Sequence, residues 1–112
     1  MIKLEIIAQP KSNKYLEFSQ SLEFIKFDLM KLCRNIEIIE ESMAFSLVAN
    51  LDSNEQLIKI LHSKELEILS GAINTLGENS EIIINGSGNI TRGSNLRAIR
   101  LVYPKIKKEK VS

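Results

Sequence analysis

The sequence predicts an α+β domain with the ferredoxin-like order β-α-β-β-α-β, in which two helices cover one face of a four-stranded antiparallel sheet. Three observations lead to this fold. Segments rich in β-branched residues alternate with segments of helical periodicity in that order. The chain has 112 residues, the size of one domain, and 44% of them are hydrophobic, which is enough for one core. The expected strands also carry apolar residues on both faces.

The first strand is expected over residues 2–8, where "IKLEIIA" places alternate apolar residues on one face, and Pro10 ends it. The "KSN" that follows offers a capping side chain for a long helix, which is expected to run to about Arg34. Five apolar residues recur along this helix at spacings of four, three, four and three. They form one buried stripe, made of Phe18, Leu22, Ile25, Leu29 and Leu32.

Two β-rich runs follow at residues 36–40 and 44–51, and the polar "ESM" between them predicts a hairpin. Because side chains alternate across a strand, every second residue of the longer run lies on the same face. The residues that share the apolar face of this run are Phe45, Leu47, Ala49 and Leu51.

Two helical segments come next. Ser53, followed three residues later by Gln56, fits a capping box for the first, and Ser63 offers a cap for the second. Gly77 is expected to end the second segment. Gly71 lies inside it and lowers helix stability by ~1 kcal/mol relative to Ala, so we expect a close approach of the helix to the sheet there. The residues expected to be buried by this helix are Leu66, Leu69, Ile73 and Leu76.

The fourth strand is expected at residues 81–85, "EIIIN", and "GSGN" after it is expected to be a flexible joint. We therefore assign residues 1–88 to the ferredoxin-like domain and 89–112 to a short C-terminal element with a basic tail. Whether residues 94–103 form a helix or a strand is left open. The two parts differ in charge: the first holds 8 Lys and Arg against 13 Asp and Glu, the second 7 against one.

The strand sequences predict a homodimer. A sheet with one face in water alternates apolar and polar residues cleanly, whereas "EIIA", "EIIE", "SLVA" and "EIIIN" do not. Both helices lie on one face, so the second face needs a cover as well. A second copy of the chain, related by a two-fold axis, is the economical cover.

Several classes of function are not expected. No apolar run approaches the ~20 residues of a membrane helix, and the N-terminus lacks the apolar stretch of a signal peptide, so we expect a cytoplasmic protein without a membrane partner. Cys33 and His62 are the only cysteine and histidine. A disulfide within the chain and a Cys/His metal site are therefore not expected. The basic tail has little aromatic character, so we expect a solvated end and no nucleic-acid partner.

The segment "LHSKELEILSGAINTLGENSEIII" at residues 61–84 resembles the antibiotic-biosynthesis-monooxygenase-like family, in particular its small quinol monooxygenases. The later "RGSNLRAIR" is similar to an ending found in the same group. The resemblance covers nearly the whole chain in element order, but as sequence it is sharp only over this segment. The positions that match the family's pattern are Leu61, Ser63, Leu69, Gly71, Ala72, Leu76, Glu78, Glu81 and Ile82.

The resemblance implies a dimeric α+β barrel with a cavity between sheet and helices in each subunit. Family members oxidise aromatic polyketides or quinols, or degrade haem, and many need no bound metal or flavin. The function implied is a cofactor-independent monooxygenase-like oxidoreductase that binds a small hydrophobic or aromatic, quinol-like molecule. We expect the ligand cavity to be lined by Phe45, Leu51, Ile60, Leu69, Phe18 and Leu22.

The alternative is a non-catalytic ligand-binding or assembly domain that kept the fold and lost the active site. Two departures from the family favour it. The chain has Leu51 where the family usually has tryptophan, and Ile60 where it often has histidine. Catalytic residues are otherwise unknown from the sequence.

His62 is the catalytic candidate that the sequence offers, because it is the one side chain whose ordinary titration lies near neutral pH. The other interpretation of His62 is a surface residue at a helix end. Cys33 is expected to be a small buried hydrophobe. Leu16, Phe24 and Phe27 lie off the main stripe of the first helix, and they either form a contact surface or are single surface hydrophobes.

Overall fold

The computed structural model describes residues 1–86 and 88–106. Residues 107–112 of the expected basic tail and Ser87 of the expected joint lie outside this described part. The elements in chain order are β1 (Ile2–Pro10), α1 (Tyr15–Leu29), β2 (Ile36–Glu41), β3 (Ala44–Leu51), α2 (Asn54–Leu61), α3 (Lys64–Leu76), β4 (Gly77–Gly86), β5 (Asn89–Gly93) and α4 (Leu96–Val102).

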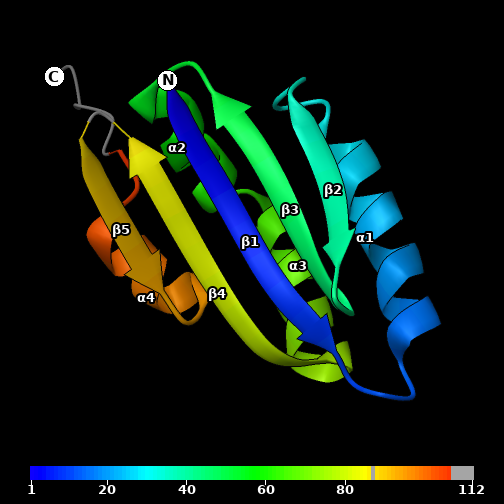
Figure 1. Cartoon of the computed structure of the whole chain (residues 1–112). Helices are drawn as coiled ribbons and strands as arrows, with labels where there is room; N and C mark the ends of the chain where they lie inside the picture. The colour runs from blue at the N-terminus through cyan, green and yellow to red at the C-terminus, as the bar shows by residue number, and fades with distance from the viewer. Residues whose placement is uncertain (87, 107–112) are drawn as a thin grey trace, which may run out of the picture.

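The strands form one sheet in the order β2-β3-β1-β4-β5, and all neighbours are antiparallel (Figure 1). The first four strands have the ferredoxin-like arrangement, so the predicted fold class is confirmed. The strand β1 lies at the centre, where Leu4 faces Ala49 on one side and Ile84 on the other. The structure adds a fifth strand that the sequence did not predict, because β5 pairs with β4 at the edge of the sheet.

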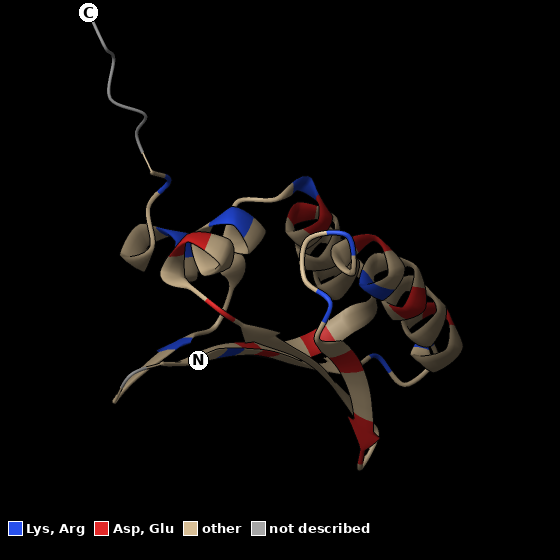
Figure 2. Ribbon diagram, turned by 90° about the horizontal axis from the view of Figure 1, so that it is seen from above, with Lys and Arg blue, Asp and Glu red and all other residues tan. Residues whose placement is uncertain are grey.

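All helices lie on one side of the curved sheet, and the other side is bare (Figure 2). The helix-facing side chains of the central strands are almost fully buried, because they are enclosed by α1, α2 and α3. They include Leu4 and Ile6 of β1, Leu47 and Leu51 of β3, and Ile82 and Ile84 of β4. Within the described residues, the core contains no buried polar or charged side chain.

The bare face of the sheet mixes apolar and charged side chains. Val48 lies on this face and is only 4% exposed, and Ile7 and Ile83 are half-buried beside it. Glu5 and Glu37 flank Val48 in the paired strands. The strands therefore do carry apolar residues on both faces, and whether a second copy covers them stays a prediction.

The helix starts follow the predicted caps. The Ser53 hydroxyl accepts a hydrogen bond from the Gln56 amide at 3.2 Å, and the Gln56 side chain in turn accepts one from the Asp52 amide at 2.9 Å. Ser63 accepts from the Leu66 amide in the same way. The first helix is shorter than expected: α1 ends at Leu29, and turns follow up to Leu32.

The expected close approach at Gly71 is wrong. A Cβ atom added to Gly71 would meet nothing within 4 Å, and the residue is exposed. The predicted register of α3 is nevertheless correct, since Leu66 and Leu69 are 1% exposed and Ile73 and Leu76 pack partly against the core. Gly71 lies on the opposite, solvent-facing side of the helix.

The segment left open at residues 94–103 contains the helix α4. Asn95 caps its start, because the side-chain oxygen accepts a hydrogen bond from the Ala98 amide at 2.9 Å. Leu96 and Ile99 turn inward and are buried, whereas Leu101 is 80% exposed. The helix α4 thus covers the part of the sheet near β5 with one narrow apolar edge.

Candidate functional site

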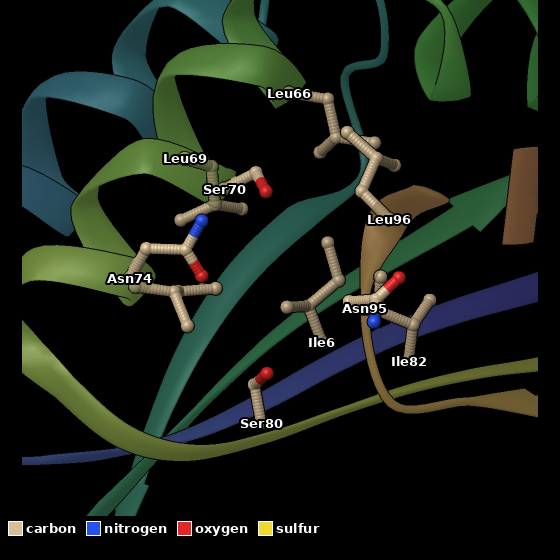
Figure 3. Close-up of a pocket in the computed structure, with 10 residues that line it drawn as sticks. Ile6, Leu66, Leu69, Ser70, Asn74, Ser80, Ile82, Asn95 and Leu96 are labelled. Carbon is tan, nitrogen blue, oxygen red and sulfur yellow. The ribbon is translucent and has the colours of Figure 1, made fainter. Parts of the chain in front are cut away.

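A small cavity lies between α3 and the start of α4, above β1 and β4 (Figure 3). Its volume is about 20 Å³. A cavity of that size has room for roughly one water molecule. Its apolar walls are formed by Ile6, Leu66, Leu69, Ile73, Ile82 and Leu96.

Four uncharged polar side chains complete the lining: Ser70 and Asn74 on α3, Ser80 on β4, and Asn95 before α4. The Ser80 hydroxyl donates a hydrogen bond to the Ser94 carbonyl at 3.0 Å, and Asn95 is occupied by its capping bond. Ser70 and Asn74 form no side-chain hydrogen bond within the described residues. Their hydroxyl and amide groups can therefore bind a ligand oxygen without breaking a protein contact.

No charged residue lines this cavity. A bound carboxylate or ammonium group would lose its hydration there without gaining an ion-pair partner, which is costly in an apolar environment. The chemistry that fits is a neutral molecule with an apolar body and one or more hydroxyl or carbonyl groups on the side of Ser70 and Asn74.

The six residues expected to line a ligand cavity are all buried, but the structure brings only Leu69 to this cavity. Phe18 and Phe45 instead pack against each other in the core, with tilted rings whose centroids are 5.5 Å apart. Leu22, Leu51 and Ile60 are also core residues. That these residues contact a ligand stays a prediction.

The polar residues of the cavity were missed by sequence reasoning. Ser70 and Asn74 are spaced by four residues, so they share one edge of α3 beside the buried Leu66 and Leu69. Two polar residues at helical spacing next to a buried stripe were the available signal. Ser80 and Asn95 had no such signal, because the fold brings them in from different elements.

His62 lies outside the cavity, at the C-terminal end of α2. Its Nε2 atom is 2.7 Å from the carbonyl oxygen of Tyr103, so the ring donates a hydrogen bond to the chain just after α4. His62 also borders a groove of about 520 Å³ next to Ile58 and Ile106. The structure shows a contact between two segments here, and a catalytic role of His62 stays a prediction.

The remaining candidates have structural roles. Cys33 is buried, and its thiol donates to the Asn50 carbonyl at 3.4 Å.

Among residues 1–86 and 88–106, no three His, Cys, Asp or Glu side chains gather closely enough to hold a metal ion. No helix in that part of the chain has the length and apolar content required to cross a membrane.

The strand order and the single helix layer define the class: a ferredoxin-like α+β protein. No protein-family model matches the sequence, and no curated protein matches it either. Solved structures do match the fold, and they agree with the resemblance seen in the sequence.

Three of these structures cover 80% of this chain. One is assigned as an antibiotic biosynthesis monooxygenase from Nitrosomonas europaea, with a TM-score of 0.67, 11% identity and 100% of its chain covered. A second antibiotic biosynthesis monooxygenase has a TM-score of 0.69, 9% identity and full coverage of its chain. A third, assigned to the same kind of protein from Deinococcus radiodurans, has a TM-score of 0.71, 14% identity and 94% coverage. The chain has their fold.

Proposed function

We propose that this chain is a monooxygenase-like domain that binds a small hydrophobic or aromatic, quinol-like molecule in the cavity between α3 and α4. The observation that carries the proposal is the lining of that cavity, with apolar walls and a cluster of uncharged polar groups. The fold gives further support, because structures with the same fold are assigned as monooxygenases.

The reaction that suits this site uses the substrate as its own reductant. An anthrone methylene group, for example, reacts with O₂ to give a carbonyl group and water, and no further electron donor is needed. The walls would exclude water and position the ring, and Ser70 or Asn74 would hold its oxygen by a hydrogen bond. This mechanism requires no metal or flavin.

The second candidate function is binding or assembly without catalysis. It is favoured by Leu51 and Ile60, which stand where the resembled family usually has tryptophan and often has histidine, and which are buried in the core. The cavity volume of about 20 Å³ limits ligand entry under either candidate. Cavities that bind drug-sized ligands have volumes of about 300–1,000 Å³, so the enclosing elements must separate before an aromatic molecule fits.

We further propose that the protein acts as a homodimer that pairs the bare faces of two sheets. Support comes from Ile7 and Ile83, half-buried side chains that place apolar surface on that face. Paired in this way, two copies would leave both cavities on the outer, helix-covered sides of the assembly, where they remain accessible to a ligand.

The test of the proposed oxidation is turnover of quinols and anthrones under oxygen, followed by oxygen consumption and product absorbance. Ser70→Leu fills the cavity from its lining, and Thr75→Leu adds the same side chain at an exposed position of the same helix. We expect turnover that is lost in Ser70→Leu and kept in Thr75→Leu. A folded protein that binds these aromatics but turns over none of them would favour the second candidate.

A further inference from the structure

Asn95 and Leu96, at the start of α4, form one wall of the cavity, and α4 is the least anchored of the elements around it. This helix has only 7 residues and buries just Leu96 and Ile99. Leu101 and Val102 on its outer side are 80% and 57% exposed. By contrast, α3 has 13 residues and packs along α1. Segments with few buried apolar contacts open at a lower free energy than the rest of a domain.

Two side chains tie α4 to the junction between α2 and α3. The Nε atom of Arg100 donates to the carbonyl oxygen of Leu61 at 2.7 Å, and its Nη1 atom lies 3.5 Å from Glu67. Leu61 provides one of the last carbonyls of α2, which have no partner within the helix. His62 adds the bond to Tyr103 described above.

The bond to Leu61 is the stronger part of the Arg100 tie. A guanidinium that donates to a helix-terminal carbonyl forms a charge-assisted hydrogen bond, and it also meets the negative end of the helix dipole. The Arg100 side chain is 25% exposed, whereas that of Glu67 is 67% exposed, so solvent weakens the ion pair more.

We propose that Arg100 is a positioning residue that holds the α4 wall of the cavity closed and thereby limits which ligands are admitted. This inference rests on the proposed function only in taking the cavity as the ligand site. Because an aromatic ring does not fit a cavity of about 20 Å³, it binds when Leu96 and Asn95 move away with α4. The apparent affinity is then reduced by the fraction of molecules that are open.

The test compares Arg100→Met, which keeps the apolar stem and loses both bonds, with the matched control Arg92→Gln. Arg92 pairs with Glu81 at 3.2 Å across β4 and β5, away from the tie to α2. The probe is 1-naphthol, used under nitrogen so that it cannot react with oxygen, and its fluorescence reports its transfer from water. We expect its association rate to rise at least fivefold in Arg100→Met and to stay unchanged in Arg92→Gln.

Hydrogen exchange gives a readout that needs no ligand. The amides at the C-terminal end of α4 and at Tyr103 should exchange at least tenfold faster in Arg100→Met than in the wild type, with α1 and Arg92→Gln unchanged. Arg100→Lys, which keeps the charge but not the planar guanidinium, should lie between the two. If Arg100→Met does not fold, Arg100→Lys and Glu67→Gln carry the comparison.

The outcomes separate the two proposals. Equal exchange in all variants, or naphthol binding to none of them, would overturn the role of Arg100. Naphthol uptake that depends on Arg100, in a protein without quinol turnover, would support the positioning role and reject the oxidation. Quinol turnover, together with naphthol uptake that is the same in the wild type and in Arg100→Met, would support the oxidation and reject the positioning role.

Discussion

Gly93 of β5 and Ile99 of α4 pack so closely that no side chain fits between them. A Cβ atom at position 93 would lie 2.7 Å from Cδ1 and 2.8 Å from Cγ1 of Ile99. This contact seats the helix α4 on the edge strand and brings Leu96 to the cavity wall. The glycine is therefore a spacing requirement of the candidate site.

Gly93→Ala should lower the free energy of unfolding by ~1–3 kcal/mol, the usual cost of overpacking a buried contact. A loss within this range is expected because both close atoms belong to the side chain of Ile99, which is 1% exposed and must shift. Urea denaturation measures the change. Unchanged stability would show that α4 does not rest on β5 as described.

Gly71→Ala should have the opposite effect. Since a Cβ atom there meets no neighbour, only the helix propensity changes, and stability should rise by up to ~1 kcal/mol. In a domain of this size that is a gain of roughly 4 °C in melting temperature. Calorimetry of the Gly71→Ala and Gly93→Ala variants under the same conditions makes each the control of the other. A lower melting temperature for Gly71→Ala would mean that the outer side of α3 contacts a neighbour after all.

Phe24 should be dispensable for folding, although it is one of four phenylalanines in the chain. It is 76% exposed on the outer side of α1, whereas Phe18 on the inner side is fully buried. Phe24→Gln should change the free energy of unfolding by less than ~0.5 kcal/mol, and Phe18→Ala should lower it by ~3–5 kcal/mol. A similar large loss of unfolding free energy in both variants would mean that Phe24 is covered in solution. The mass of the assembly would then be measured next.

Sedimentation at micromolar concentration should give twice 12.7 kDa, the mass of the proposed homodimer. Ile83→Lys places a charge on the bare face of the sheet and should shift the protein toward the monomer. Ile68→Lys, at an exposed position of α3, is the matched control and should leave the mass unchanged. A wild-type monomer that unfolds cooperatively would contradict the dimer.

The elements that the sequence predicted well are those with local signals. Ser53 and Ser63 mark helix starts by hydrogen bonds within one turn, and the stripe of α1 is visible in its spacing alone. The strand β5 has no such signal, since "NITRG" is short, contains glycine and lacks alternation. Its pairing with β4 stabilises it, and that is a tertiary contact.

The candidate site was harder to predict for a related reason. The spacing of apolar residues predicts which of them are buried. A cavity forms where buried segments do not pack fully against each other, and its position depends on elements far apart in the chain. Phe18 and Phe45, two of the expected cavity residues, pack against each other with tilted rings instead. The cavity formed where α3 meets Asn95 and Leu96, in a part of the chain whose structure the sequence left open.

The central place of β1 also bears on how a nascent chain folds. Ile6 is synthesised before both of its neighbours in the sheet, Leu47 and Ile82. The sheet therefore stays incomplete until most of the chain has been synthesised, and such long-range pairing slows folding. Until then β1 has unpaired edges and exposed apolar side chains. The nascent chain is most prone to aggregation at this stage, and a chaperone would act on it then.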